Sequence, residues 1–412
     1  MTKLTPAVTL ADIEAAAEAI SGAVIRTPML RSPRLSALTD ADVFIKYENV
    51  QSTASFKERG ALNRLLALSQ AERQRGVVAM SAGNHAQAVA THGHRLGIPV
   101  TIVMPVTTPF VKVDATRAYG AQVLLHGESL SESQAKAEQL AREGDLVLVH
   151  PYDDPAVIAG QGTVALEMLE DVPALDMLVV PVGGGGLIAG NAVAAKALRP
   201  EIEILGAEAA LYPSVWNALH GMARPCGGPT LAEGIAVKTV GQLTLPIIRD
   251  LISDILLVGE DHLERAVNCY LTLQKTVAEG AGAAGLAAML SEPERFRGRR
   301  VGLILTGGNI DSRILASVMV RELERDGRIV SFRLTIPDRP GVLGVIATRL
   351  GELDANILDV DHRRLFLDVP AKGARLDITV EARDASHIEN ISAALAREGY
   401  EPQRIESVMS ME

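Results

Sequence analysis

Short apolar runs alternate with Ala- and Leu-rich stretches over the first three quarters of the chain. Apolar runs of this length predict strands, and the longer stretches between them predict helices. The predicted strands are residues 43–48, 76–81, 100–104, 122–125, 146–149, 177–182, 202–207, 255–258 and 301–305. The predicted helices include residues 61–68, 86–96, 132–142 and 189–197. Strand–helix alternation is typical of parallel sheets with helices on both faces, so we expect an α/β fold.

The pattern changes after Asp326. Phe332, Leu334 and Ile336 alternate with polar residues, as in a strand with one buried face. A PDRPG turn follows, and the next predicted elements are a helix at 342–353, strands at 357–361 and 374–380, a helix at 386–398 and a strand at 404–408. This β-α-β-β-α-β order predicts a separate ferredoxin-like unit of about 80 residues.

Composition narrows the class of protein. The chain has 412 residues, of which 48% are apolar and 22% charged, so it has material for two or three packed domains. Its net charge of −10 argues against nucleic acid as the main partner. No apolar run approaches the roughly 20 residues of a membrane span. Two cysteines, Cys226 and Cys269, make no disulfide framework, so we expect a reducing, cytoplasmic location.

The motif STASFKERGA puts Lys57 between a predicted strand and a predicted helix. A lysine at the mouth of an α/β sheet can form an imine with an aldehyde. Taken alone, the motif is explained more simply by a solvated lysine at a helix start.

The motif MSAGNHAQAVA contains Ser81, Gly83, Asn84 and His85 where a predicted strand passes into a helix. Backbone N–H groups at such a helix start hold anions, and a carboxylate would suit them. The alternative is an ordinary strand–loop–helix turn in which His85 caps or packs.

The motif PVGGGGLIAG places four glycines after an apolar strand. Such a loop can close around a phosphate, with the following helix adding its positive end. Gly184, Gly186 and Ala189 also satisfy GxGxxA, with Glu208 roughly 20 residues later, so dinucleotide binding stays open at this point. A fourth motif, LTGGNIDS, offers the Thr306 hydroxyl and two glycines at another strand end, although a plain turn would look the same.

Taken together and in this order, SFK-x-RGA, S-x-GNHAQ, the Gly tetrad and TGGN resemble the fold-type II pyridoxal phosphate enzymes, and most closely their threonine dehydratase branch. The resemblance covers about residues 5–325. The tail, with DRPGVLGVIATRLGELDANI, resembles an ACT-type regulatory domain. The resemblance implies two doubly wound parallel-sheet domains, a large one at 1–42 and 150–325 and a small one at 43–149, followed by the ferredoxin-like unit at 330–412.

The resemblance also implies the site. Lys57 would carry pyridoxal phosphate as an imine, Asn84 would bind its ring hydroxyl, and Thr306 would face its ring nitrogen. The implied cofactor-binding residues are Phe56, Lys57, Asn84, Gly183, Gly184, Gly185, Gly186, Leu187 and Thr306. The implied substrate residues are Ser81, Asn84 and His85.

The activity implied by the resemblance is deaminating dehydration of L-threonine to 2-oxobutanoate and ammonia, with Lys57 as general base and isoleucine synthesis as the destination. Serine would also react. Serine racemases of the family carry a second Ser where this chain has Ala82, so racemisation should be minor.

Several alternatives remain from the sequence. The substrate could be serine or 3-hydroxyaspartate, and a serine racemase-type enzyme stays open. A β-replacement synthase usually carries TSGNTG in place of SAGNHAQ. A nicotinamide dehydrogenase would leave Lys57 and TGGN unexplained. A sensor with an inactive core is disfavoured by the intact Lys57.

For the tail we expect a branched-chain amino acid such as isoleucine as effector, bound near Asp338, Gly341, Asn356 and Ile357. The alternative is that this unit only dimerises edge to edge. The family is typically dimeric or tetrameric, so we expect a homodimer or homotetramer.

The region around Glu208 resembles part of a cation site of some relatives, but AALYPS lacks the second acidic residue, so no metal is assigned.

Overall fold

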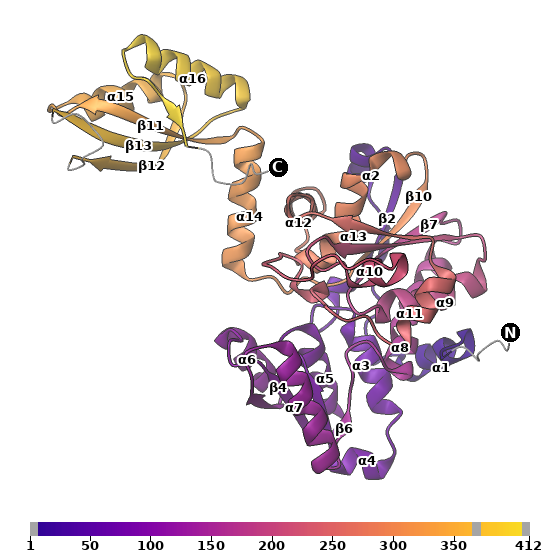
Figure 1. Ribbon diagram of the computed structural model, residues 1–412. Helices are drawn as coiled ribbons and strands as arrows, with labels where there is room; N and C mark the ends of the chain where they lie inside the picture. The colour runs from indigo at the N-terminus through magenta and orange to yellow at the C-terminus, as the bar shows by residue number, and fades with distance from the viewer. Residues whose placement is uncertain (1–6, 365–371, 406–412) are drawn as a thin grey trace. The chain divides into compact units, whose positions relative to one another are not determined.

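The apolar runs of residues 1–311 form two separate sheets (Figure 1). The larger sheet has the strand order β1-β2-β10-β7-β8-β9, and the smaller has the order β5-β4-β3-β6. Neighbouring strands are parallel, apart from the β1–β2 pair, which is antiparallel. The computed structural model describes residues 7–364 and 372–405.

The nine predicted strands of this unit are all present, with small changes at their ends. The larger sheet contains β1 (Met29–Arg31), β2 (Asp42–Tyr47), β7 (Met177–Pro181), β8 (Glu203–Ala209), β9 (Asp254–Val258) and β10 (Arg300–Leu305). The smaller contains β3 (Val77–Met80), β4 (Val100–Met104), β5 (Gln122–Leu125) and β6 (Val147–Leu148). The strand that the sequence did not predict, β1, has three residues and no buried one.

One predicted domain boundary is wrong. Residues 43–149 were assigned to the small domain, but β2 pairs in register with β10 from Asp42 to Tyr47, inside the larger sheet. Sequence order does not reveal this, because strands that lie side by side in a parallel sheet can be far apart along the chain.

Helices connect the strands of both sheets. They are α1 (Leu10–Ile20), α2 (Pro33–Thr39), α3 (Lys57–Leu66), α4 (Gln70–Arg75), α5 (Asn84–Leu96), α6 (Phe110–Ala118), α7 (Leu130–Glu143), α8 (Pro155–Asp171), α9 (Gly186–Leu198), α10 (Ser214–His220), α11 (Thr244–Leu251), α12 (Glu260–Leu273) and α13 (Gly280–Ser291), with 3-10 turns η1 (Glu48–Val50), η2 (Glu233–Ile235) and η3 (Pro293–Arg295). Val77 and Ala79 of β3 share a core with α5, whereas Val78 shares one with α7. The small sheet is therefore covered on both faces, as a doubly wound fold requires.

Helices α8 and α9 form the main core beside the larger sheet, with Ile158, Val164 and Ile188 fully buried. Glycines let these two helices approach closely. A Cβ on Gly190 would collide with the carbonyl oxygen of Ile158, and one on Gly162 would lie 2.8 Å from the carbonyl oxygen of Gly190. This close packing fixes α9, and with it the glycine loop that precedes it.

A buried ion network anchors α3. Arg59 of α3 lies 2.8 Å from Glu48 and 2.7 Å from Glu167 of α8, and Lys46 of β2 lies 2.5 Å from the second oxygen of Glu167. The side chains of Lys46, Glu48 and Arg59 are wholly inaccessible to solvent, and that of Glu167 is 15% exposed. The network ties the start of α3 to both the sheet and α8, and it therefore fixes the position of Lys57.

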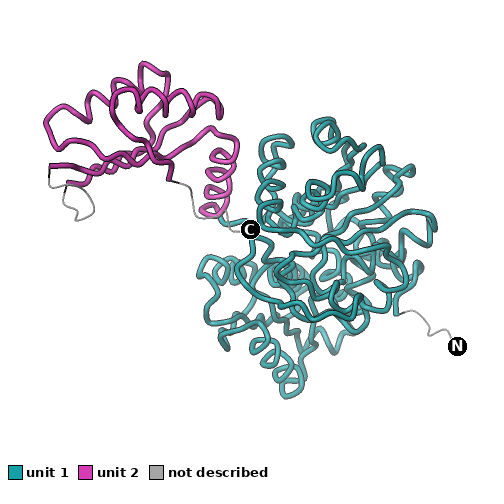
Figure 2. The backbone as a smooth tube through the Cα atoms, turned by 45° about the horizontal axis from the view of Figure 1, so that its top comes forward, with its two compact units in different colours: residues 1–311 teal, residues 312–412 magenta. Residues whose placement is uncertain are grey.

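Residues 312–412 form the second unit (Figure 2). It contains α14 (Ser312–Arg325), β11 (Ile329–Pro337), α15 (Val342–Glu352), β12 (Asn356–Arg363), β13 (Gly373–Glu381), α16 (Ala385–Arg397) and β14 (Gln403–Arg404). The sheet is antiparallel, with the order β12-β13-β11-β14. The β-α-β-β-α-β unit predicted from the alternation is confirmed.

The register of this second sheet follows the alternation of its apolar residues. Phe332 lies opposite Ile378 and Leu334 opposite Leu376, and all four are fully buried.

The boundary between the units differs from the predicted one. The sequence assigns residues up to 325 to the large domain, but the second compact unit begins at Ser312 and includes α14. Residues 406–408 of the last predicted strand lie outside the described residues. No helix in the described part of either unit is both long and apolar enough to cross a bilayer.

Candidate active site

Lys57 is the first residue of α3, and its amine lies inside the N-terminal unit. Its Nζ donates a hydrogen bond to the carbonyl oxygen of Pro151 at 2.9 Å and lies 5.1 Å from the centre of the Phe56 ring. Burial lowers the pKa of Lys57 to about 8, while the charge of Glu279 opposes the shift. Near neutral pH a larger share of this amine is therefore uncharged than for a surface lysine.

Backbone hydrogen bonds join the Lys57 segment to the TGGN loop after β10. The N–H of Phe56 donates to the carbonyl oxygen of Thr306 at 3.0 Å, and the N–H of Gly308 donates to that of Ala54 at 3.0 Å. Ser55 and Gly307 form an antiparallel bridge between the two segments. Two motifs about 250 residues apart in sequence are thus neighbours, because both lie where parallel strands end at one edge of a sheet.

Asn84, the first residue of α5, joins the same group. Its Nδ2 donates to Oε1 of Glu279 at 2.7 Å, and its Oδ1 accepts from Nδ2 of Asn309 at 2.8 Å. Burial raises the pKa of Glu279 to about 7, and the hydrogen bond from Asn84 opposes this shift. Glu279, the N-cap residue of α13, was not predicted from the sequence, since an acidic residue before a helix is common.

The four glycines lead from β7 into the first residue of α9, and a Cβ on any of them would lie within 3.1 Å of a neighbouring atom. One on Gly184 would collide with the ring of Tyr152, and one on Gly186 would lie 2.9 Å from the Cα of Tyr152. Gly185 has φ of +94° and caps α9. Only glycine suits a backbone packed this closely at positive φ. The first N–H groups of α9, including that of the buried Leu187, have no partners within the helix, which is the arrangement that binds a phosphate.

Tyr152 connects the glycine loop to Lys57. It follows Pro151, the hydrogen-bond partner of Lys57, and its own hydroxyl donates to the carbonyl oxygen of Thr239 at 2.9 Å. The loop of residues 150–153 therefore contacts both the amine and the glycines. This loop was not predicted from the sequence, because no residue in HPYDD has a fixed chemical role of its own.

The predicted substrate residues differ in their surroundings. Ser81 is partly buried, and its Oγ accepts from the N–H of Gly83 at 3.1 Å. His85 is 3% exposed, and its Nε2 lies 3.0 Å from the carbonyl oxygen of Val149. Burial lowers the pKa of His85 to about 3, so the ring is neutral and Nε2 carries the hydrogen. Nε2 is therefore engaged by the protein itself, and a substrate contact of His85 stays a prediction.

Glu208 caps a helix in this structure. Its carboxylate accepts from the N–H groups of Val215 and Trp216 at 2.8 and 2.9 Å and from the hydroxyl of Ser214 at 3.2 Å. Burial raises the pKa of Glu208 to about 7. Among the described residues, no group of three or more His, Cys, Asp or Glu side chains is arranged to hold a metal ion.

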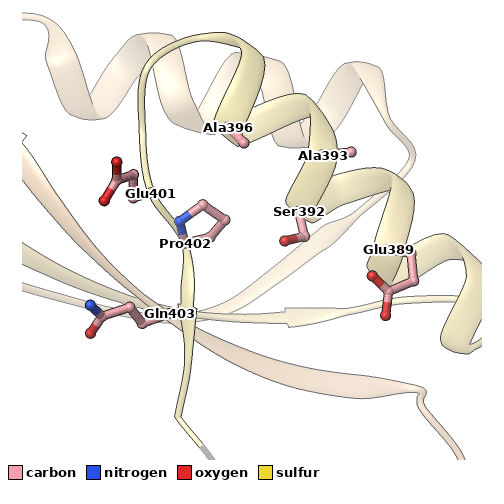
Figure 3. Close-up of a pocket in the computed structure, with 7 residues that line it drawn as sticks. All are labelled: Glu389, Ser392, Ala393, Ala396, Glu401, Pro402 and Gln403. Carbon is pink, nitrogen blue, oxygen red and sulfur yellow. The ribbon is translucent and has the colours of Figure 1, made fainter.

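Shallow hollows lie on the described part of the second unit. One, of about 420 Å³, lies between α16 and the segment leading into β14 (Figure 3) and is lined by Glu389, Ser392, Ala393, Ala396, Glu401, Pro402 and Gln403. Another, of about 410 Å³, lies along α15 and is lined by Gly341, Gly344, Val345, Thr348, Arg349, Glu352 and Glu398. Of the four predicted effector residues, Gly341 alone lines either hollow. The carboxylate of Asp338 lies 3.4 Å from Arg364.

Comparisons with known proteins show the family of the chain. A family model described as pyridoxal-phosphate dependent enzyme matches residues 20–307. The chain is 42% identical over 396 residues to the L-threonine ammonia-lyase of Thermotoga maritima, covering 96% of this chain and 98% of that one. The structure of maize serine racemase matches with a TM-score of 0.72 and 36% identity over 77% of this chain and 99% of that one. The processed form of threonine deaminase isoform 2 from Solanum lycopersicum matches with a TM-score of 0.71 and 34% identity over 78% of this chain and 93% of that one.

Proposed function

The chain belongs to the family of pyridoxal-phosphate-dependent enzymes, and from this premise we propose that it is a threonine ammonia-lyase, which converts L-threonine to 2-oxobutanoate and ammonia. One observation carries the proposal. The Lys57 amine, the Asn84 amide and the glycine loop converge from distant parts of a chain that resembles an L-threonine ammonia-lyase over nearly its whole length. L-Serine, giving pyruvate, is the expected second substrate.

The residues present fit the cofactor. Lys57 would bind its aldehyde carbon, Asn84 its ring hydroxyl, and Thr306 its ring nitrogen, with Phe56 beside the ring. Its phosphate would be held by the backbone N–H groups of the segment Gly183, Gly184, Gly185, Gly186 and Leu187. The loop suits a phosphate because the Tyr152 ring leaves no room for a side chain on Gly184, so that the segment offers backbone N–H groups alone. When bound, pyridoxal phosphate supplies an electron sink for the α-carbon of an amino acid.

The chain's own groups would perform two tasks. The Lys57 amine, whose pKa of about 8 leaves it partly neutral, would accept the α-proton as general base. The loop of Ser81 and Asn84 would bind the substrate carboxylate, because the first N–H groups of α5 lack helical partners. Over the whole reaction the α-hydrogen and the β-hydroxyl of L-threonine leave as one water molecule, and a second water molecule replaces the amino group, which gives 2-oxobutanoate and ammonia.

A product assay tests the proposal. The purified protein with pyridoxal phosphate should release equimolar 2-oxobutanoate and ammonia from L-threonine, more slowly release pyruvate from L-serine, and spare 3-hydroxyaspartate. Exclusive use of serine or 3-hydroxyaspartate would assign another dehydratase. Formation of D-serine as the main product would assign a racemase, and an absence of turnover with every one of these amino acids would leave the sensor alternative.

We also propose that the second unit binds a branched-chain amino acid such as isoleucine. Gly341 supports this, since its φ of +89° caps α15 and it lines the hollow along that helix. Asp338 is the further candidate, because it follows Pro337 at the same end of β11 as Gly341. The expected grouping with Asn356 and Ile357 is wrong, because the register places these two residues opposite Glu381 and Val380, at the Ile329 end of β11. Calorimetric titration with isoleucine and valine tests the proposal.

We also propose that the protein is a cytoplasmic homodimer or homotetramer. Light scattering would measure the number of chains in the assembly.

A further inference from the structure

The Asn84 amide is held from both sides by side chains of other segments. Glu279 lies before α13 and accepts from Asn84 Nδ2 at 2.7 Å. Asn309 lies in the TGGN loop and donates to Asn84 Oδ1 at 2.8 Å. The same Asn309 nitrogen also donates to the backbone carbonyl of Thr53 at 2.8 Å. Three polar side chains from three segments therefore form one chain of hydrogen bonds that begins at a backbone group.

The direction of this chain is fixed by chemistry. A backbone carbonyl only accepts hydrogen bonds, so the atom of Asn309 that faces Thr53 must be its NH₂ group. That group carries two hydrogens, and the second one faces Asn84, which must therefore present its oxygen. At the other end the ionised carboxylate of Glu279 only accepts, so it receives the NH₂ group of Asn84. Both ends demand the same orientation of the Asn84 amide.

The backbone around Glu279 supports the arrangement. The N–H of Glu279 donates to the carbonyl oxygen of Gly307 at 3.0 Å. A Cβ on Gly307 would collide with the Glu279 carboxylate and would lie 3.2 Å from Asn84 Nδ2. The glycine at this position leaves the carboxylate room to reach Asn84.

We propose that Glu279 and Asn309 are positioning residues that fix the Asn84 amide so that its remaining N–H is directed to the ring hydroxyl oxygen of the cofactor. The inference rests on the proposed function through the role of Asn84. Because an N–H can only donate, the ring oxygen bound there acts as an acceptor, which favours its ionised form. Glu279 and Asn309 act through Asn84 and need no contact with the substrate.

Cofactor affinity and the cofactor's absorption spectrum test the proposal in the full-length protein. Glu279→Ala removes the group that accepts from the Asn84 amide. Asn309→Asp places a carboxylate beside the carbonyl oxygen of Thr53 and the Oδ1 of Asn84, which it cannot bond. Each should weaken pyridoxal phosphate binding about tenfold, the size of effect seen when the groups that orient a ligand-binding residue are lost. Each should also move absorption from the visible band to the near ultraviolet. Glu279→Gln keeps an acceptor of the same shape and should restore both properties. Glu294→Ala, on an exposed side chain of η3, is the control.

Two results would overturn the inference. One is wild-type affinity and spectrum in both Glu279→Ala and Asn309→Asp. The other is a Glu279→Gln protein as impaired as Glu279→Ala, which would show that the charge acts and not the orientation. If the wild-type protein binds pyridoxal phosphate but does not deaminate threonine, the proposed function fails while these measurements still decide the inference. A wild-type protein that binds no pyridoxal phosphate would overturn both.

Discussion

The two units of this chain use sheets of opposite kinds to present polar groups. In residues 1–311 the loops after parallel strands meet, so that Asn84 bonds partners 195 and 225 residues away. In residues 312–412 the antiparallel sheet pairs neighbouring strands, and its polar residues lie on the face away from the core. Arg333 and Asp377, for example, bond each other at 2.8 Å across adjacent strands.

The difference explains why the sequence predicts the site of the first unit better than the ligand of the second. A site at parallel strand ends needs a glycine, an amide or an amine at a fixed place in each loop, so each loop carries a short motif. In the second unit polar side chains pair across adjacent strands, as Arg333 does with Asp377, and its hollows are open and shallow. The alternation of apolar and polar residues in the second unit predicts its fold. The identity of its ligand depends on surface residues that follow no fixed pattern.

The largest effect is expected for Lys57→Ala, which separates the two units by function. Loss of the general base should lower the turnover of L-threonine by about a thousandfold or more. Calorimetric binding of isoleucine to the second unit should persist. The rates of 2-oxobutanoate release and the calorimetric heats are the measurements, and near-normal turnover in the variant would refute the role of Lys57.

The next effect concerns the glycine loop. Gly184→Ala should lower cofactor affinity about tenfold or more, because the new methyl group would collide with the Tyr152 ring and overpacking of this kind costs about 1–3 kcal/mol. Gly227→Ala is the matched control, since a Cβ there meets nothing within 4 Å. Fluorescence titration with pyridoxal phosphate measures the affinity. Equal affinities in the two variants would mean that the loop is not the cradle.

Removal of residues 312–412 tests whether the units work independently. The shortened chain should keep its threonine deamination rate within about a factor of two, because Lys57, Asn84 and the glycine loop all lie in the first unit. Any response to isoleucine or valine should disappear. A matched chain ending at Arg325 retains α14 and should behave in the same way. A response that survives in either shortened chain would move the effector site into the first unit.

The smallest effect is expected for Ala82→Ser. The methyl group of Ala82 cannot transfer a proton, whereas a serine hydroxyl at this place could deliver one to the opposite face of the substrate. The wild-type protein in deuterated water should therefore form little D-serine, and the variant measurably more. Chiral chromatography gives both amounts. Abundant D-serine from the wild-type protein would contradict this reading of Ala82.

Most of the fold could be predicted because apolar periodicity reports burial directly. Strand β7 has five buried residues and was evident, whereas β1 has none and was missed. The membership of β2 in the larger sheet could not be predicted, since its partner β10 lies more than 250 residues later. Pairing at that distance leaves no trace in the local pattern.

Some residues of the candidate site could be predicted from the sequence, and others could not. Lys57, Asn84 and the glycine loop stand in motifs. Pro151 and Tyr152 link Lys57 to the glycine loop, and Asn309 links Asn84 to Thr53 in the Lys57 segment. Glu279 stands in no such motif, because its importance comes from one long-range bond to Asn84. In the second unit, the turn predicts a role for Gly341, which lines the hollow along α15, but nothing in the local pattern indicates which side chains line that hollow with it.

The buried ion network has a consequence for how this chain can change over evolutionary time. Lys46, Glu48, Arg59 and Glu167 balance two positive charges with two negative ones almost out of reach of water. Replacing a single member would leave an uncompensated charge at a cost of about 3–5 kcal/mol, a large share of the roughly 5–15 kcal/mol that holds a typical domain together.

Single substitutions at these four positions should therefore be eliminated, and related sequences should differ there at several positions together or not at all. Because Arg59 stands two residues after Lys57, the same constraint protects the residues around the reactive amine from gradual drift. Divergence in this segment would then proceed by rare joint replacements, while the surface residues of the same helix vary freely.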